Sequence, residues 1–147
     1  MKNTISRRTI LITVPALVVA AGGASAAWFR RLPADLDLAR QKATAAGTYV
    51  AAIQSQQDPV AVGTMHAWIV TLTDREGRPV DGARIAIDGG VPQHGHGLPT
   101  VPAVARDMGD GRYLVEGVKF NMAGWWELKL AIDAARGSDT VTFNILL

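Results

Sequence analysis

A loop rich in glycine and proline carries two histidines. It reads GGVPQHGHGLPTVP over residues 89–102, with His94 and His96 separated only by Gly95. Residues i and i+2 of an extended chain point the same way, so both imidazoles are able to reach one ion. Imidazole nitrogen binds copper, zinc, iron and nickel. The pair therefore predicts a metal site, and the alternative is a solvated polar loop.

Three further side chains are candidate ligands. His66 begins a predicted strand and Met65 precedes it, while Met122 lies in a predicted turn. Thioether sulfur selects copper in its reduced state. We expect His66, with Met65 or Met122, to lie at the same pole of the fold as the two loop histidines and to complete a copper site. The alternative for His66 is a half-buried histidine bonded to backbone, because it shares a face with Trp68 and Val70.

Zinc is the lesser alternative to copper. The three histidines would then hold the ion, with its fourth position open. No obvious general base accompanies them, so hydrolysis is not expected. The chain has no cysteine, and beyond the leader its only serines are Ser55 and Ser138, neither in a nucleophile motif. We therefore do not expect an enzyme.

Trp125 is a candidate contact for a protein partner. Alternation places it with Glu127 and Lys129 on the outer face of a strand, where a large apolar side chain is unexpected. Exposed tryptophans often anchor partners. The alternative is that Trp125 packs under a loop or over a sheet edge.

The domain that holds these residues is expected to be all-β. From residue 48 onward, short alternating runs are separated by turn signals, and Gly109-Asp110-Gly111 marks a hairpin. The expected inward residues include Trp68, Val70 and Leu72. About seven strands at this spacing predict an immunoglobulin-like antiparallel β-sandwich over residues 48–147, preceded by a polar lead-in segment over residues 27–47.

The first residues predict export. A positive n-region, an apolar run and the small residues Ala24-Ser25-Ala26 form a signal peptide over residues 1–26, with cleavage after Ala26. The alternative is an uncleaved helical membrane anchor to about residue 29, because a spanning helix needs about 20 apolar residues. Either way, the domain is expected to be periplasmic or otherwise extracytoplasmic.

The net charge argues against nucleic acid as a partner. The chain carries 15 basic and 13 acidic residues, a formal charge of +2. Three of the basic residues are Lys2, Arg7 and Arg8 of the leader, so the remainder has 12 basic and 13 acidic residues, a charge of −1. No basic stripe for phosphates remains.

The sequence resembles a known group of domains. DREGRPVDGARIAIDGGVPQHGHGLPT, GDGRYLVEGVKFNMAGWWELKLAI and DTVTFNI are similar to the FixH-like/YtkA-like family of small exported or membrane-anchored bacterial domains. The resemblance covers residues 62–147. It implies an immunoglobulin-like sandwich outside the cytoplasmic membrane, associated with copper handling and with assembly of respiratory oxidases.

The resemblance also bears on individual residues. His94 and His96 match the family's histidine-bearing loop, and Met122 and Trp125 match its second distinctive stretch. That loop often begins with Met-Pro in the family, whereas Val91 precedes the proline here. If that methionine is a copper ligand in relatives, this chain lacks it.

Two functions remain open from the sequence. The first is a periplasmic copper-binding domain that delivers metal to an acceptor protein or assists oxidase assembly. The second is a structural or assembly module that binds no metal and docks on a membrane protein complex through Trp125.

Overall fold

Apolar residues at every second position build the core of the domain. β3 (Met65–Asp74) buries Trp68, Val70 and Leu72, each no more than 1% exposed. β8 (Trp125–Ala134) alternates in the same way, with the buried residues Trp126, Leu128, Leu130 and Ile132. Trp68, Val70 and Leu72 are the inward residues named from the sequence, and β8 follows the same alternation.

The computed structural model describes residues 32–147, so the predicted leader and its helix lie outside the described residues. Among residues 32–147 no helix has the length and hydropathy needed to span a membrane. These residues form nine strands: β1 (Gln41–Ala43), β2 (Tyr49–Ser55), β3 (Met65–Asp74), β4 (Arg84–Val91), β5 (His96–Gly97), β6 (Ala103–Gly109), β7 (Arg112–Lys119), β8 (Trp125–Ala134) and β9 (Gly137–Leu146).

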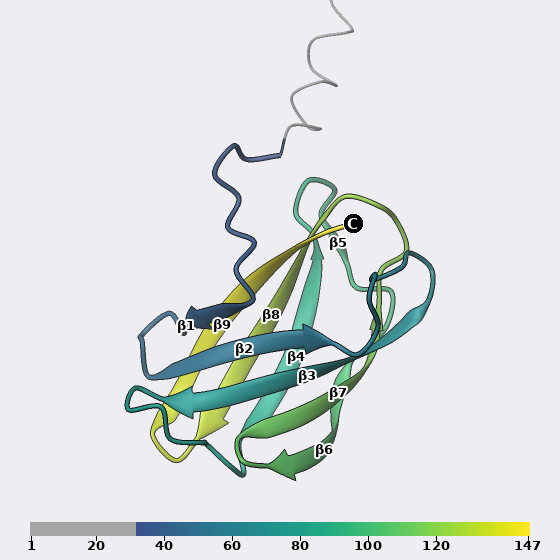
Figure 1. Cartoon of the computed structure of the whole chain (residues 1–147). Helices are drawn as coiled ribbons and strands as arrows, with labels where there is room; N and C mark the ends of the chain where they lie inside the picture. Colours follow the sequence, from purple (N-terminus) through teal and green to yellow (C-terminus); the bar gives the residue numbers. More distant parts are fainter. Residues whose placement is uncertain (1–31) are drawn as a thin grey trace, which may run out of the picture. The chain divides into compact units, whose positions relative to one another are not determined.

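The strands form two antiparallel sheets that pack face to face (Figure 1). One has the order β1-β2-β3-β7-β6 and the other β5-β4-β8-β9. When the two short strands β1 and β5 are set aside, seven strands remain in the ABED and CFG orders of a constant-type immunoglobulin domain. The predicted immunoglobulin-like sandwich is confirmed.

Two short strands, β1 and β5, are present in addition to the seven-stranded core that the sequence predicts. The sequence also predicts a lead-in segment over residues 27–47 ahead of the sandwich. β1 lies within that segment and pairs with β2, so the sandwich begins before residue 48. β5 is only two residues long and pairs with the end of β4.

Side chains of the lead-in segment join the two sheets. The guanidinium of Arg40 donates to the backbone carbonyl of Asn144 (2.7 Å), and the ammonium of Lys42 donates to that of Thr142 (3.1 Å). Both carbonyls belong to β9, the edge of the other sheet. The long polar side chains of the segment donate hydrogen bonds to backbone carbonyls of this edge strand, which is why the segment lacks the alternation of an ordinary strand.

Phe120 lies at the centre of an aromatic cluster at one pole of the sandwich. Its ring centroid is 5.3 Å from that of Trp126, 6.5 Å from that of Trp68 and 6.0 Å from that of His66. Trp126 belongs to one sheet, and Trp68 and His66 belong to the other. Phe120 therefore fills the space between the sheets where β7 leads into β8.

A buried carboxylate fixes the other end of the lead-in segment. Asp139 is 7% exposed and accepts hydrogen bonds from the Thr44 hydroxyl (2.6 Å) and from the backbone N–H groups of Ala46, Thr48 and Thr140. Of these donors the Thr44 hydroxyl contributes most, and together they hold the pKa of Asp139 well below its usual range, although burial opposes the shift. The ionised carboxylate therefore stabilises the fold.

We expect Asp139→Asn to lower the melting temperature at neutral pH and to flatten the loss of stability in acid. A folded-state pKa below the unfolded value of about 3.9 means that stabilisation is present above that value and is lost as pH falls below it. Thermal unfolding between pH 2.5 and pH 7 measures both effects. Equal melting temperatures of wild type and variant at pH 7, with parallel acid limbs, would contradict this role.

Candidate functional site

A tight turn holds the two loop histidines at the tip of a hairpin. The turn joins β4 to β5, and the N–H groups of His94 and Gly95 both donate to the carbonyl of Val91, at 3.1 and 3.0 Å. Gly95 has a φ of +64°, a conformation that glycine adopts at little cost. After the turn, the N–H of Leu98 returns to the carbonyl of Gly89 (3.0 Å). The chain therefore reverses direction between the two histidines.

The turn brings the imidazoles of His94 and His96 together. Their ring centroids lie 6.1 Å apart, the ring planes are tilted by 31°, and both side chains are exposed. Strand alternation predicts that both rings can reach one ion. It does not explain why the rings lie close together, because His94 lies in the turn and only His96 lies in a strand. The left-handed backbone at Gly95 produces this proximity instead.

Two glycines of β4 allow neighbouring backbones to approach closely at this site. A Cβ atom on Gly90 would lie 2.1 Å from the carbonyl oxygen of His96, and one on Gly89 would lie 2.2 Å from that of Glu127. Real Cβ atoms essentially never approach so closely. The absence of side chains at Gly89 and Gly90 therefore lets β5 and β8 lie against β4.

A cavity of about 230 Å³ adjoins the histidine loop on the outer side of its sheet. His96, Glu127 and Lys129 line it, and the Lys129 ammonium pairs with the Glu127 carboxylate at 3.0 Å. Alternation in the sequence predicts that Glu127 and Lys129 lie on an outer face, but it does not connect them with the loop. The link depends on the register that pairs Gly90 with Glu127, which no local pattern encodes.

His66 lies in the core and not beside the loop histidines. It is 3% exposed, and its Nε2 donates to the carbonyl of Ala61 (2.7 Å), with the Thr64 hydroxyl 3.1 Å away. Its Nδ1 is buried and has no hydrogen-bond partner among the described residues. This agrees with the alternative interpretation of His66 as a buried histidine bonded to backbone.

The two candidate methionines lie in different surroundings. Met65 is 53% exposed, because it points away from the core while the adjacent His66 points into it. Met122 is partly buried against the core, and its carbonyl accepts a hydrogen bond from the indole of Trp126 (3.0 Å). Successive side chains of a strand point to opposite faces. The sequence alone therefore predicts that Met65 and His66 point in opposite directions.

Trp125 lies on the outer face of its sheet, half-buried. Its indole Nε1 donates to the side-chain oxygen of Asn144 (2.9 Å) on β9. Its cross-strand neighbour is Leu146, which is 44% exposed. The two side chains form an apolar pair at the end of the sheet, where β8 begins and β9 ends.

Within the described part of the chain, no group of three or more His, Asp or Glu side chains is arranged to hold a metal ion. The structure thus brings together His94 and His96, and it does not bring His66 to them. Two neighbouring exposed imidazoles provide two nitrogen donors and leave the other coordination positions open to water or to a second molecule.

The chain was compared with known proteins. No curated protein matches it. The family model described as YtkA-like matches residues 43–131, a span that includes the histidine loop and the whole of β2 to β7. That match covers more than half of the chain, and the protein therefore belongs to the YtkA-like family.

Proposed function

We propose that the protein is an extracytoplasmic metal-binding domain and that copper is its metal. The observation that carries this proposal is the proximity of the exposed His94 and His96 rings, 6.1 Å apart on a turn of defined conformation. A loop selected only for solubility has no need of two adjacent imidazoles or of close backbone contacts at Gly90. The predicted leader over residues 1–26 supports a location outside the cytoplasm.

The donor set favours copper over zinc. Divalent first-row metals bind nitrogen sites with affinities that peak at Cu²⁺ and fall again at Zn²⁺. The chain has no cysteine to supply thiolate, and Met65 and Met122 lie in different surroundings. A three-histidine zinc site has no support, because the ring of His66 is buried with its Nε2 already bonded.

The open coordination of such a site suits metal transfer. Two protein ligands leave positions at which an acceptor can bind the ion before the donor releases it. The Glu127–Lys129 pair beside His96 adds no net charge, so it neither traps a cation nor repels one. We therefore infer delivery of copper to an acceptor protein, including an oxidase under assembly, as the role of the site.

We expect the double variant His94→Ala/His96→Ala to weaken Cu²⁺ binding by at least about 100-fold, or about 2.7 kcal/mol. Each imidazole supplies one of the two nitrogen ligands, and both side chains are exposed, so the fold should be retained. Isothermal titration calorimetry with a competing chelator measures the affinity, and circular dichroism checks the fold. Gln93→Ala is the matched control, because it changes the same turn and keeps both imidazoles. Wild-type affinity in the double variant would exclude this site.

A second candidate function rests on the Trp125–Leu146 pair. An outer-face tryptophan beside a 44% exposed leucine is an apolar feature that a partner protein can cover. In this case the domain docks on a membrane protein complex without metal. The two candidates differ in their response to a chelator: it releases a partner held through copper and leaves one held through Trp125.

A further inference from the structure

The edge of β2 is only partly covered by β1. β1 pairs with residues 50–52 of β2, and the last contact is the hydrogen bond from the Ile53 N–H to the carbonyl of Arg40 (2.8 Å). Before Arg40 the chain lies over β9, where the side-chain amide of Asn144 donates to the carbonyl of Asp37 (2.7 Å). β1 therefore leaves the end of β2 without an edge neighbour.

The exposed end of this edge carries backbone groups that can pair with another strand. Antiparallel strands point successive residues alternately toward one neighbour and the other. The N–H of Gln56 donates to the carbonyl of Ala67 on β3 (2.9 Å), so the backbone N–H and C=O of Ser55 point to the opposite side, where β1 has ended. No backbone group of residues 32–147 pairs with Ser55 on that side.

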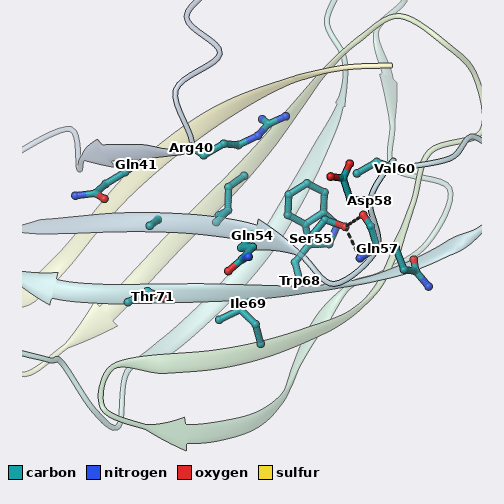
Figure 2. A pocket seen from close by; sticks show the side chains of 12 residues that line it. Arg40, Gln41, Gln54, Ser55, Gln57, Asp58, Val60, Trp68, Ile69 and Thr71 are labelled. Atoms are coloured by element: carbon teal, nitrogen blue, oxygen red, sulfur yellow. Dashed lines mark hydrogen bonds between the residues drawn. The ribbon is translucent and has the colours of Figure 1, made fainter.

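A cavity of about 540 Å³ lies beside this edge, larger than the cavity at the histidine loop (Figure 2). Arg40 extends from the start of β1 over the ring of Trp68, and Asp58 lies across the cavity from β1. The Ser55 hydroxyl donates to the carbonyl of Gln57 (2.7 Å), so this side chain bonds to the turn that follows β2. Ligand cavities in proteins commonly measure about 300–1,000 Å³.

Arg40 brings a positive charge to the cavity that no carboxylate of residues 32–147 neutralises. Its guanidinium carbon lies 6.0 Å from the Trp68 ring centroid, and one of its N–H groups donates to the Asn144 carbonyl. Partial burial lowers the pKa of Arg40, the expected result when a cation loses part of its hydration without an ion-pair partner. An anionic ligand would replace the lost hydration with a charge-assisted hydrogen bond.

We propose that this cavity binds the C-terminal end of an extended peptide, which adds to the edge of β2 in line with β1. Its backbone pairs with Ser55, and its terminal carboxylate binds the guanidinium of Arg40. β1 runs antiparallel to β2 and begins at residue 41, so a segment in line with it and running the same way ends next to Arg40. This orientation places a carboxylate, and not an amino terminus, at the guanidinium.

Asp58 should have the opposite effect to Arg40 on the binding of a peptide carboxylate. Its carboxylate lines the same cavity and forms no ion pair with Arg40, so it repels a bound carboxylate. Arg40 and Asp58 are both exposed, and neither side chain is part of the buried core. Removal of the Asp58 charge should therefore raise affinity, a direction that a general loss of structure cannot reproduce.

The test uses the full-length chain and a pool of acetylated tetrapeptides randomised at all four positions. One pool has free C-terminal carboxylates and the other C-terminal amides, and mass spectrometry quantifies the peptides retained by the protein. We expect about fivefold greater retention of the free acids, the effect of one partly exposed ion pair. Arg40→Gln should abolish the preference, and Asp58→Asn should increase retention of the acids about twofold.

Lys42→Gln is the matched control, because Lys42 also binds a β9 carbonyl but does not line the cavity. It should keep the preference for free acids. In a parallel hydrogen-exchange measurement, the Ser55 amide should exchange rapidly in the free protein and become protected with the peptide pool. Equal retention of acids and amides, no retention of either, or an unchanged preference in Arg40→Gln would overturn the proposal.

Discussion

Replacement of Phe120 by alanine is expected to lower the free energy of unfolding by about 3–5 kcal/mol. Phe120 is fully buried, and its ring contacts Trp126 of one sheet and Trp68 and His66 of the other. Its removal leaves a cavity between rigid aromatic rings, which cannot close without moving a sheet. Urea unfolding followed by tryptophan fluorescence gives the free energy, and an unchanged m-value confirms that the unfolding transition is the same.

Val101→Ala is the control for this change. Val101 is 92% exposed, so its truncation should alter the free energy of unfolding by less than about 0.5 kcal/mol. A loss below about 1 kcal/mol for Phe120→Ala would mean that the sheets close over the missing ring, and that the aromatic cluster does not hold this pole of the sandwich together.

The second large effect is expected from a single methyl group at Gly90. A Cβ there would lie 2.1 Å from the carbonyl oxygen of His96, so Gly90→Ala must displace β5 from β4. Overpacking of this kind costs about 1–3 kcal/mol. Displacement of β5 also moves His96 away from His94, and we expect Cu²⁺ affinity to fall about tenfold, or about 1.4 kcal/mol. Thermal unfolding and copper titration of the same variant measure both effects.

Gly97 provides the matched control, because it is the cross-strand partner of Gly90. A Cβ on Gly97 would lie 3.7 Å from the carbonyl oxygen of Gly89, an ordinary contact. Gly97→Ala should therefore retain both stability and copper affinity. If Gly90→Ala binds copper as the wild type does while its stability falls, the position of β5 does not determine the metal site.

The long strands could be predicted from sequence because their side chains alternate. In β3 and β8 the apolar residues repeat with period two over whole strands, and the Gly109-Asp110-Gly111 turn adopts the positive φ angles that its composition indicates. β1 and β5 carry no such repeat. β1 is fixed by side chains that reach β9, and β5 by the missing side chain of Gly90, and neither interaction leaves a local pattern.

Only part of the candidate site could be predicted from the sequence, because some of its contacts leave no local sequence pattern. The pairing of His94 with His96 follows from two histidines one residue apart, although the turn and not strand alternation brings them together. The burial of His66 follows from its place on the face of Trp68, as the alternative interpretation of this residue predicts. The cavity at Arg40 depends on where β1 leaves β2, which requires the three-dimensional arrangement.

The hydrogen bonds from Arg40 and Lys42 to β9 limit the order in which the fold can be completed. Arg40 and Lys42 bind carbonyls that lie 104 and 100 residues further along the chain. A ribosome makes β1 before β9, so the partners of these side chains do not exist until the strands between them have been made. Contacts of such long sequence separation also slow folding, because a large loop must close before they form. The hydrogen bonds between the two sheets therefore cannot form until β9 has been made, and a nascent chain that lacks β9 leaves this side of the sandwich open.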